Sequence, residues 1–331
     1  MDPALVGRMR AESNYIESAN PGDVMHCYGI GQVIESKNPQ VQVGEVRLGR
    51  LDMQEYSIFT DAEETTVINL GLTSEQHYLS AVGITGATAY FSLLDIGKPK
   101  RGETILISSG ASSVASVVAQ MAKRLGLKTV GIVSTDEKAK QAKADWDYNE
   151  VISYRGKSID ELSADIGNAC PSGVDIYYDN TSGDISEAVL DHFNDFARHI
   201  VIGRMAISHL ADTRKDVGRR DNSDVLSKRL TKQGFVLLDY QPIYRAAFLQ
   251  LAKWVNQGEL KSKCDIADGI EQAETAFFRM LNGESQGKQL LRLSEVDHSV
   301  DPAKRWLPKL LTSNYFPTER LVKRIRSGFK R

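Results

Sequence analysis

The segment "ILISSGASSVASVVAQMAKRLG" at residues 105–126 combines a short apolar run, a turn of small residues and a stretch with helical periodicity. In the last part, apolar residues recur at spacings that place them on one helical face: Val114, Val117, Val118, Met121, Ala122 and Leu125. The segment therefore predicts a strand, a tight turn and a helix packed against a sheet. That layout is typical of a loop that binds a dinucleotide cofactor.

Such a loop needs glycine at three positions. The first glycine permits the tight turn, the second lets the backbone approach the pyrophosphate, and the third lets helix and strand pack closely. Gly110 meets the first need, and Ala115 is a mild compromise at the third. Ser112 adds a side chain where the backbone should meet phosphate, so its hydroxyl either crowds the phosphate or donates a hydrogen bond to it. The candidate cofactor contacts in the loop are Gly110, Ala111, Ser112, Ser113 and Val114.

The composition of the 331 residues is that of an ordinary globular protein, 41% hydrophobic and 25% charged. A net charge of −2 argues against nucleic acid as the main partner. No apolar run reaches the roughly 18 residues of a membrane span, and the opening residues lack a signal-peptide core. The three cysteines, Cys27, Cys170 and Cys264, are far apart in the sequence. Their spacing predicts neither a disulfide framework nor a metal site, so we expect a cytoplasmic, metal-free protein.

Strands and helices alternate after about Leu79, which predicts a parallel, doubly wound sheet. Short apolar runs and glycines before residue 60 predict an all-β piece. Helices at 242–257 and 270–282 and a strand at 287–293 are expected to return to that piece. The predicted strands of the doubly wound sheet are 104–109, 128–134, 150–154, 174–179, 199–203 and 235–240.

The end of the second predicted strand reads "STDEK", residues 134–138. An NAD site uses an acid about 20 residues after the loop to hold the adenosine ribose, and Asp136 lies at a suitable distance. Ser134 and Lys138 instead suit the 2′-phosphate of NADPH, since a hydroxyl and an ammonium both donate to an anion. The simpler alternative is a helix cap followed by a solvated lysine.

Several longer stretches resemble one enzyme family. They are "GITGATAYFSLLDI" (83–96), "KPKRGETILIS" (98–108), "VVAQMAKRLGLKTVGI" (117–132), "GVDIYYDN" (173–180) and "FFRMLNGESQGKQLLRL" (277–293). Together they resemble the zinc-independent medium-chain dehydrogenases/reductases. The branch of NADPH-dependent alkenal, leukotriene and prostaglandin reductases is the most similar, from about residue 1 to Leu293.

The resemblance implies a Rossmann doubly wound sheet and a GroES-like β domain, here shortened at its N-terminal side. The expected domains are 1–82 with 241–293 (GroES-like) and 83–240 (Rossmann), followed by a basic C-terminal extension at 294–331. The family usually forms homodimers. It transfers a hydride from NADPH to the β-carbon of an α,β-unsaturated carbonyl compound, and the enolate is then protonated.

By position, the resemblance assigns cofactor roles to further residues. Lys138 and Tyr154 match the pair that holds the 2′-phosphate, and Thr85 matches a residue near the nicotinamide. Asn180 matches the asparagine of the family's "DNVGG". Gly203, at the end of the fifth predicted strand, and Ser285, where the family has the asparagine of "NxGK", complete the predicted site.

The departures from the family pattern favour a second hypothesis. Ser112, Ala115, Ser182 and Ser285 replace residues on the cofactor side, and Ser227 or Asn222 stands where many members have a tyrosine that steadies the enolate. The chain is therefore either an NADPH-dependent reductase of a C=C bond, or a member that lost hydride transfer and catalyses non-redox cyclisation, isomerisation or elimination in a biosynthetic pathway. A third hypothesis is a catalytically silent scaffold.

The proton donor is the least defined part of the site. Tyr240 follows the sixth predicted strand, where a phenol can reach a small-molecule substrate, although a packing role is the simpler interpretation. Arg204 and His209 lie near the expected nicotinamide, and the charged segment 212–224 is expected to border the substrate cleft. In the extension, Leu321, Val322, Ile325 and Phe329 predict one apolar helical face that covers an open edge of the β domain.

Overall fold

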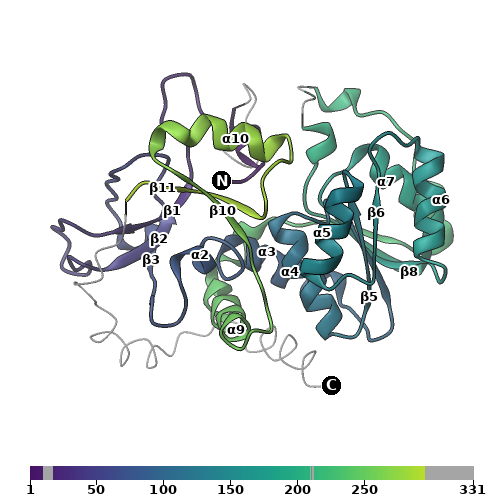
Figure 1. Ribbon diagram of the computed structural model, residues 1–331, viewed down its shortest axis with the longest axis horizontal. Helices are drawn as coiled ribbons and strands as arrows, with labels where there is room; N and C mark the ends of the chain where they lie inside the picture. Colours follow the sequence, from purple (N-terminus) through teal and green to yellow (C-terminus); the bar gives the residue numbers. More distant parts are fainter. Residues whose placement is uncertain (10–17, 209, 211, 295–331) are drawn as a thin grey trace.

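The computed structural model describes residues 1–9, 18–208, 210 and 212–294. Figure 1 shows a β-rich unit, built from both ends of this part of the chain, beside a larger α/β unit. The predicted apolar face of the extension and His209 lie outside the described residues. No helix within the described ranges is long and apolar enough to cross a membrane.

A six-stranded parallel sheet forms the centre of the α/β unit, in the order β6-β5-β4-β7-β8-β9. This order reverses direction between β4 and β7, which is the topological switch point of a Rossmann sheet. The predicted doubly wound parallel sheet is confirmed. The strands are β4 (Thr104–Ile107), β5 (Lys128–Val133), β6 (Glu150–Ser153), β7 (Val174–Asp179), β8 (Phe193–Val201) and β9 (Thr231–Gly234).

Helices cover both faces of this sheet, because its central strands are apolar on both sides. In β4, Ile105 and Ile107 face one core and Leu106 faces the other. The first core is closed by α3 (Ile84–Phe91), α4 (Ser113–Arg124), α5 (Asp136–Trp146) and α9 (Tyr244–Asn256). The second is closed by α6 (Ile159–Ala169), α7 (Gly183–Val189) and α8 (Asn222–Lys228).

The sixth strand was predicted wrongly at 235–240. The edge strand β9 lies at Thr231–Gly234, and a 3-10 helix, η6, spans Leu237–Ile243. All four residues of β9 are exposed and polar or glycine, so no apolar pattern marks it. The more apolar residues Phe235 and Leu237 pack instead against the core beside α3.

The helix that opens the α/β unit has two parts. It begins as α3 at Ile84, after Gly83, and its last six residues, Ser92–Gly97, form a π-helix, η2. The fifth strand starts earlier than predicted, at Phe193 rather than residue 199.

Two small sheets form the β-rich unit. Strands β1 (Tyr28–Gln32), β2 (Val46–Arg50) and β3 (Thr65–Val67) are antiparallel, and β10 (Cys264–Asp268) pairs in parallel with β11 (Lys288–Arg292). The Met1 amine donates to the Gln289 carbonyl at 2.8 Å. The predicted return to the first β piece is therefore confirmed for the last helix and strand, which pack or pair beside Met1. The helix predicted at 242–257 instead packs in the core that it shares with α3 and α4. Its helices are α1 (Leu5–Arg8), α2 (Glu75–Tyr78) and α10 (Ala273–Leu281).

Helix α9 joins the two units. Its Ala247 and Leu251 are buried in the same core as α3, and the rings of Trp254 and Tyr90 lie 6.2 Å apart. The boundary between residues 240 and 241 remains a prediction, as do the other domain boundaries. Five 3-10 segments besides η6 complete the described elements: Ala62–Glu64, Leu190–His192, Met205–Ile207, Thr213–Lys215 and Ile270–Gln272.

Candidate functional site

The loop that follows β4 lies at the switch point of the sheet. The amide of Gly110 donates to the carbonyl of Ile132 at 2.8 Å, which pulls the loop onto β5. A Cβ atom on Gly110 would lie only 3.2 Å from the Cα of Gly131. Glycine at 110 therefore permits this close approach, as the first position of a dinucleotide loop requires.

Ser112 acts as the N-cap of α4, since its hydroxyl oxygen accepts a hydrogen bond from the Ala115 amide at 3.4 Å. The hydroxyl hydrogen is still available to donate. The amides of Ser113 and Val114, in the first turn, have no partner inside the helix and carry the positive end of its dipole. This helix end, together with Ala111, can hold a diphosphate.

A buried tyrosine holds the loop at Gly110 through a hydrogen bond. Tyr148, just before β6, donates its hydroxyl hydrogen to the Gly110 carbonyl at 3.0 Å. Burial raises the pKa of the Tyr148 phenol, so the phenol stays a donor at physiological pH. No sequence pattern predicts this contact, because residue 148 lies in a connection with no motif.

Two cations meet at the carboxyl ends of β5 and β6. Lys138 is half-buried on the first turn of α5, and burial, followed by the nearby charge of Arg155, lowers its pKa. Neither side chain has an ion pair with a carboxylate among the described residues. Tyr154 and Ser134 lie at the same strand ends, where the Arg155 amide donates to the Ser134 carbonyl at 3.2 Å.

Asp136, the acid that an NAD site would use for the ribose, is hydrogen-bonded to another side chain. Asp136 accepts a hydrogen bond from the Ser153 hydroxyl at 2.5 Å, and Thr135 caps α5 through the Lys138 amide. The capping interpretation of "STDEK" is therefore correct for Thr135, and it leaves the ammonium of Lys138 free to bind an anion. Arg155 is a cation that sequence reasoning missed, although it directly follows the predicted Tyr154.

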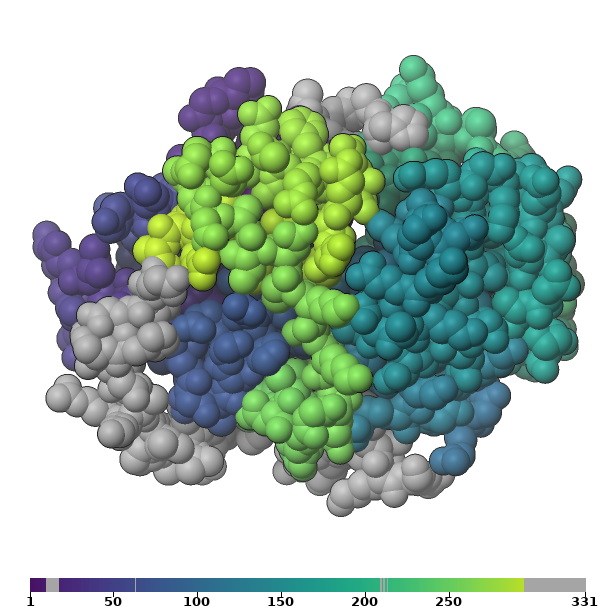
Figure 2. All heavy atoms as spheres, viewed as in Figure 1, coloured from purple at the N-terminus to yellow at the C-terminus, as the bar shows by residue number. Residues whose placement is uncertain are grey.

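Both units contribute to this end of the site. A Cβ atom on Gly283, in the loop after α10, would lie 2.9 Å from the Lys138 Nζ atom, so the ammonium reaches that loop. Ser285 follows in the same loop. Figure 2 shows the surface hollowed between the yellow-green atoms of the α10–β11 region and the teal atoms of the α/β unit.

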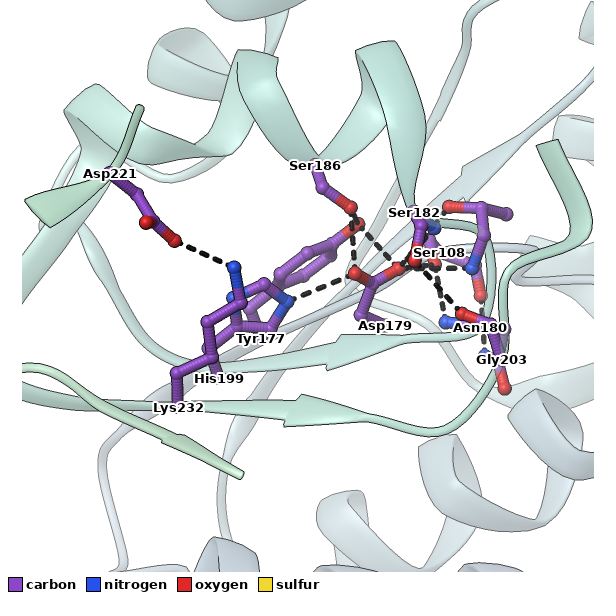
Figure 3. Close-up of polar contacts among 11 residues, drawn as sticks. Ser108, Tyr177, Asp179, Asn180, Ser182, Ser186, His199, Gly203, Asp221 and Lys232 are labelled. Atoms are coloured by element: carbon purple, nitrogen blue, oxygen red, sulfur yellow. Dashed lines mark hydrogen bonds and ion pairs between the residues drawn. The ribbon is translucent and has the colours of Figure 1, made fainter. Parts of the chain in front are cut away.

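Asn180, directly after β7, links the ends of β7 and β4 at the switch point. Its side-chain amide donates to the Ser108 carbonyl at 2.7 Å, and its backbone amide donates to the Ser108 hydroxyl at 2.8 Å. A Cβ atom on Gly203 would lie 2.9 Å from the Asn180 carbonyl oxygen, so only glycine fits there without a shift. These contacts place both predicted residues beside the loop (Figure 3).

A small pocket lies between the β-rich unit and the start of α3. Thr85 contributes from α3 and is buried, whereas Tyr28, from β1, is 42% exposed and its hydroxyl has no hydrogen bond to a described residue. The sequence analysis did not select Tyr28. The pocket is lined by Met1, Asp2, Tyr28, Leu48, Tyr78, Leu79, Ile84, Thr85, Lys288 and Leu290.

Tyr240 has the contacts of a packed aromatic side chain. Its hydroxyl donates to the Asp95 carboxylate at 2.7 Å, and its ring stacks on Phe91 with centroids 4.9 Å apart. Burial and the neighbouring Asp95 raise the pKa of the phenol. The charged segment 212–224 is held to the rest of the unit by Arg219, which pairs with Asp191 at 2.6 Å.

Two family models match the chain. One is described as the N-terminal domain of oxidoreductase and matches residues 1–68, and the other is described as zinc-binding dehydrogenase and matches residues 113–255. In the described part of the chain, no three His, Cys, Asp or Glu side chains are grouped so that they could hold a metal ion.

Known proteins extend the match over most of the chain. The NADP⁺-dependent 2-alkenal reductase of Nicotiana tabacum is 31% identical, over 88% of this chain and 84% of that protein. The NADPH-dependent curcumin reductase of Escherichia coli is 30% identical, over 90% and 86%. The crystal structure of CurA from Vibrio vulnificus in complex with NADPH superposes with a TM-score of 0.80 at 30% identity, over 89% and 87% of the two chains. The chain therefore belongs to the zinc-independent branch of the medium-chain dehydrogenases/reductases, the branch of the NADPH-dependent alkenal and prostaglandin reductases.

Proposed function

We propose that the protein is an NADPH-dependent reductase of the C=C bond of an α,β-unsaturated carbonyl compound. The observation that carries the proposal is the pair of cations, Lys138 and Arg155, at the strand end where the 2′-phosphate would bind. The helix N-terminus after Gly110, at the carboxyl end of the neighbouring strand β4, offers a second anion site. The names of the tobacco and E. coli relatives support the same cofactor and substrate class.

Different residues would bind the different parts of NADPH. Lys138 and Arg155, with Tyr154 and Ser134, would hold the 2′-phosphate and so select NADPH over NADH, because NADH lacks that charge. The amides of the first turn of α4 would hold the diphosphate. Thr85 and Gly203 would lie beside the nicotinamide, which, when bound, supplies the hydride.

Tyr28 is the proton donor that we propose in addition to the predicted Tyr240. Tyr28 lines the pocket together with Thr85, and its hydroxyl has no hydrogen bond to a described residue, so the hydroxyl is available to a substrate carbonyl oxygen. A phenol can donate a hydrogen bond to that oxygen and a proton to the enolate. The apolar walls formed by Leu48, Leu79 and Ile84 would limit access of water.

One observation favours the alternative, non-redox function. Ser112 already takes the Ala115 amide as its own hydrogen-bond partner, so one of the N–H groups that would contact the diphosphate is engaged. A protein with that function would isomerise, cyclise or eliminate its substrate while the nicotinamide remained unchanged.

We further propose a cytoplasmic homodimer. All four residues of β9 are exposed, and β9 is the edge strand of its sheet, on which a second copy can pair. The three cysteines are unpaired, which suits a reducing compartment. Sedimentation analysis decides the oligomeric state, because a monomer at every concentration would contradict the dimer.

The function is tested by titrating the purified protein with NADPH and then adding a panel of enones and alkenals. We expect binding of NADPH and loss of nicotinamide absorbance that depends on the enone, with a saturated carbonyl product. Conversion of substrate without loss of NADPH would support the non-redox alternative. Absence of NADPH binding at millimolar concentration would refute the proposal.

A further inference from the structure

His199 is a buried histidine next to the site, and no motif marks it. It lies on β8, is 2% exposed, and its Nε2 atom is 2.9 Å from the Oδ2 atom of Asp179. Its ring packs on Tyr177, with centroids 4.9 Å apart, and on Phe193, at 5.9 Å. The imidazole thus has a fixed position in the sheet (Figure 3).

Asp179 receives hydrogen bonds on both carboxylate oxygens. Oδ1 accepts the backbone amides of Thr181 and Ser182 at 2.9 and 2.8 Å, and Oδ2 accepts the Ser186 hydroxyl at 2.7 Å. Burial alone would raise the pKa of Asp179, but His199 and these donors hold it below its ordinary value. The carboxylate is therefore ionised and organises the turn that follows β7.

The tautomer of His199 follows from this arrangement. An ionised carboxylate can only accept, so Nε2 carries the hydrogen. Nδ1 is buried and has no hydrogen-bond partner among the described residues. The Nε2–H group is therefore the one that His199 offers to a neighbour, and Asp179 receives it. Lys232, the partner of His199 in β9, forms an ion pair with Asp221 at 2.6 Å instead.

A short path connects Asp179 to the loop that we assign to the diphosphate. The turn held by Asp179 contains Ser182, whose φ is +58° and whose hydroxyl donates to the Gly203 carbonyl at 3.1 Å. It also contains Asn180, which holds Ser108 through two hydrogen bonds. Ser108 lies two residues before Gly110.

We propose that His199 is a positioning residue for the dinucleotide site: its Nε2–H group fixes the Asp179 carboxylate, which sets the turn 179–183 and, through Asn180 and Ser108, the loop at Gly110. The inference rests on the proposed function, because it assigns the loop to NADPH. It differs from a packing role in one respect. At an equal loss of unfolding free energy, removal of the hydrogen bond should weaken NADPH binding more than removal of packing does.

Three variants test the proposal. His199→Leu removes the donor, His199→Gln keeps a side-chain N–H, and Phe193→Leu removes packing from the same ring cluster without touching Asp179. For each, NADPH affinity is measured by calorimetry and unfolding free energy by denaturant titration. The hydrogen on Nε2 is checked in the wild type by ¹⁵N NMR of the imidazole, which needs no variant to fold.

We expect the dissociation constant of NADPH to rise about tenfold or more in His199→Leu, because a buried carboxylate loses a donor. His199→Gln should restore most of the affinity, and Phe193→Leu should lose stability but little affinity. An Nδ1–H tautomer, or an equal loss of affinity in Phe193→Leu at equal loss of stability, overturns the inference. Wild-type affinity in all variants overturns the inference alone, whereas no NADPH binding by the wild type overturns it together with the proposed function.

Discussion

Replacement of Lys138 by alanine should weaken NADPH binding and leave NADH binding almost unchanged. The ammonium is half-buried and lies with Arg155 at the end of β5, without a carboxylate partner among the described residues. A hydrogen bond to a charged group contributes about 1.5–3 kcal/mol. We take the lower half of that range because Lys138 is only half-buried and Arg155 remains, which corresponds to a loss of affinity of roughly tenfold or somewhat more.

The assay is calorimetric titration of both cofactors against the wild type and the variant. Lys140→Ala is the matched control, since Lys140 is an exposed lysine on the same helix, and it should change neither affinity. Equal losses for NADPH and NADH would refute the assignment of Lys138 to the 2′-phosphate. A loss in Lys140→Ala as large as in Lys138→Ala would show that only general charge matters.

The affinity should also depend on pH in a defined direction. Burial first, and Arg155 second, lower the pKa of Lys138 in the free protein, and the ammonium is the form that binds phosphate. NADPH affinity should therefore be complete below this lowered pKa and fall as the pH rises through it. The dependence should disappear in Lys138→Ala.

Four further substitutions have separable outcomes. Tyr148→Phe leaves the buried Gly110 carbonyl without its donor, so denaturant titration should show a loss of about 1–3 kcal/mol together with weaker NADPH binding. Ser112→Gly frees the Ala115 amide at a cost of a few tenths of a kcal/mol for the lost cap, so calorimetry should show tighter NADPH binding, and weaker binding would contradict this. Tyr28→Phe should lower kcat for an enone by about 10²-fold. Tyr240→Phe should mainly lower the free energy of unfolding, because it removes the hydrogen bond to Asp95. A loss of kcat in Tyr240→Phe but not in Tyr28→Phe would make Tyr240 the proton donor.

Much of the α/β unit could be predicted from local pattern. Strands β4, β5 and β7 are buried on both faces, so each is a nearly continuous apolar run that stands out in the sequence. The edge strand β9 could not be predicted, because its four residues face solvent and carry no apolar alternation. The neighbouring apolar residues, from Phe235, were assigned to the strand in its place.

The candidate site could be predicted where it depends on one segment, and not where it depends on several. Gly110, Lys138 and Asn180 belong to motifs that follow a strand, so their positions could be inferred from the chain order. The contacts of Tyr148 with Gly110 and of His199 with Asp179 join segments that are 38 and 20 residues apart. Only the register of neighbouring strands brings them together, and single-sequence patterns do not encode that register.

The most direct test of the central claim is isotope transfer from NADPH deuterated at the nicotinamide C4 position to an enone substrate. Our account predicts that mass spectrometry and NMR of the product show one deuterium at the former β-carbon and a solvent hydrogen at the α-carbon. Product formation without deuterium from the cofactor, with the NADPH unconsumed, would contradict it and leave the Rossmann unit as a scaffold for non-redox chemistry.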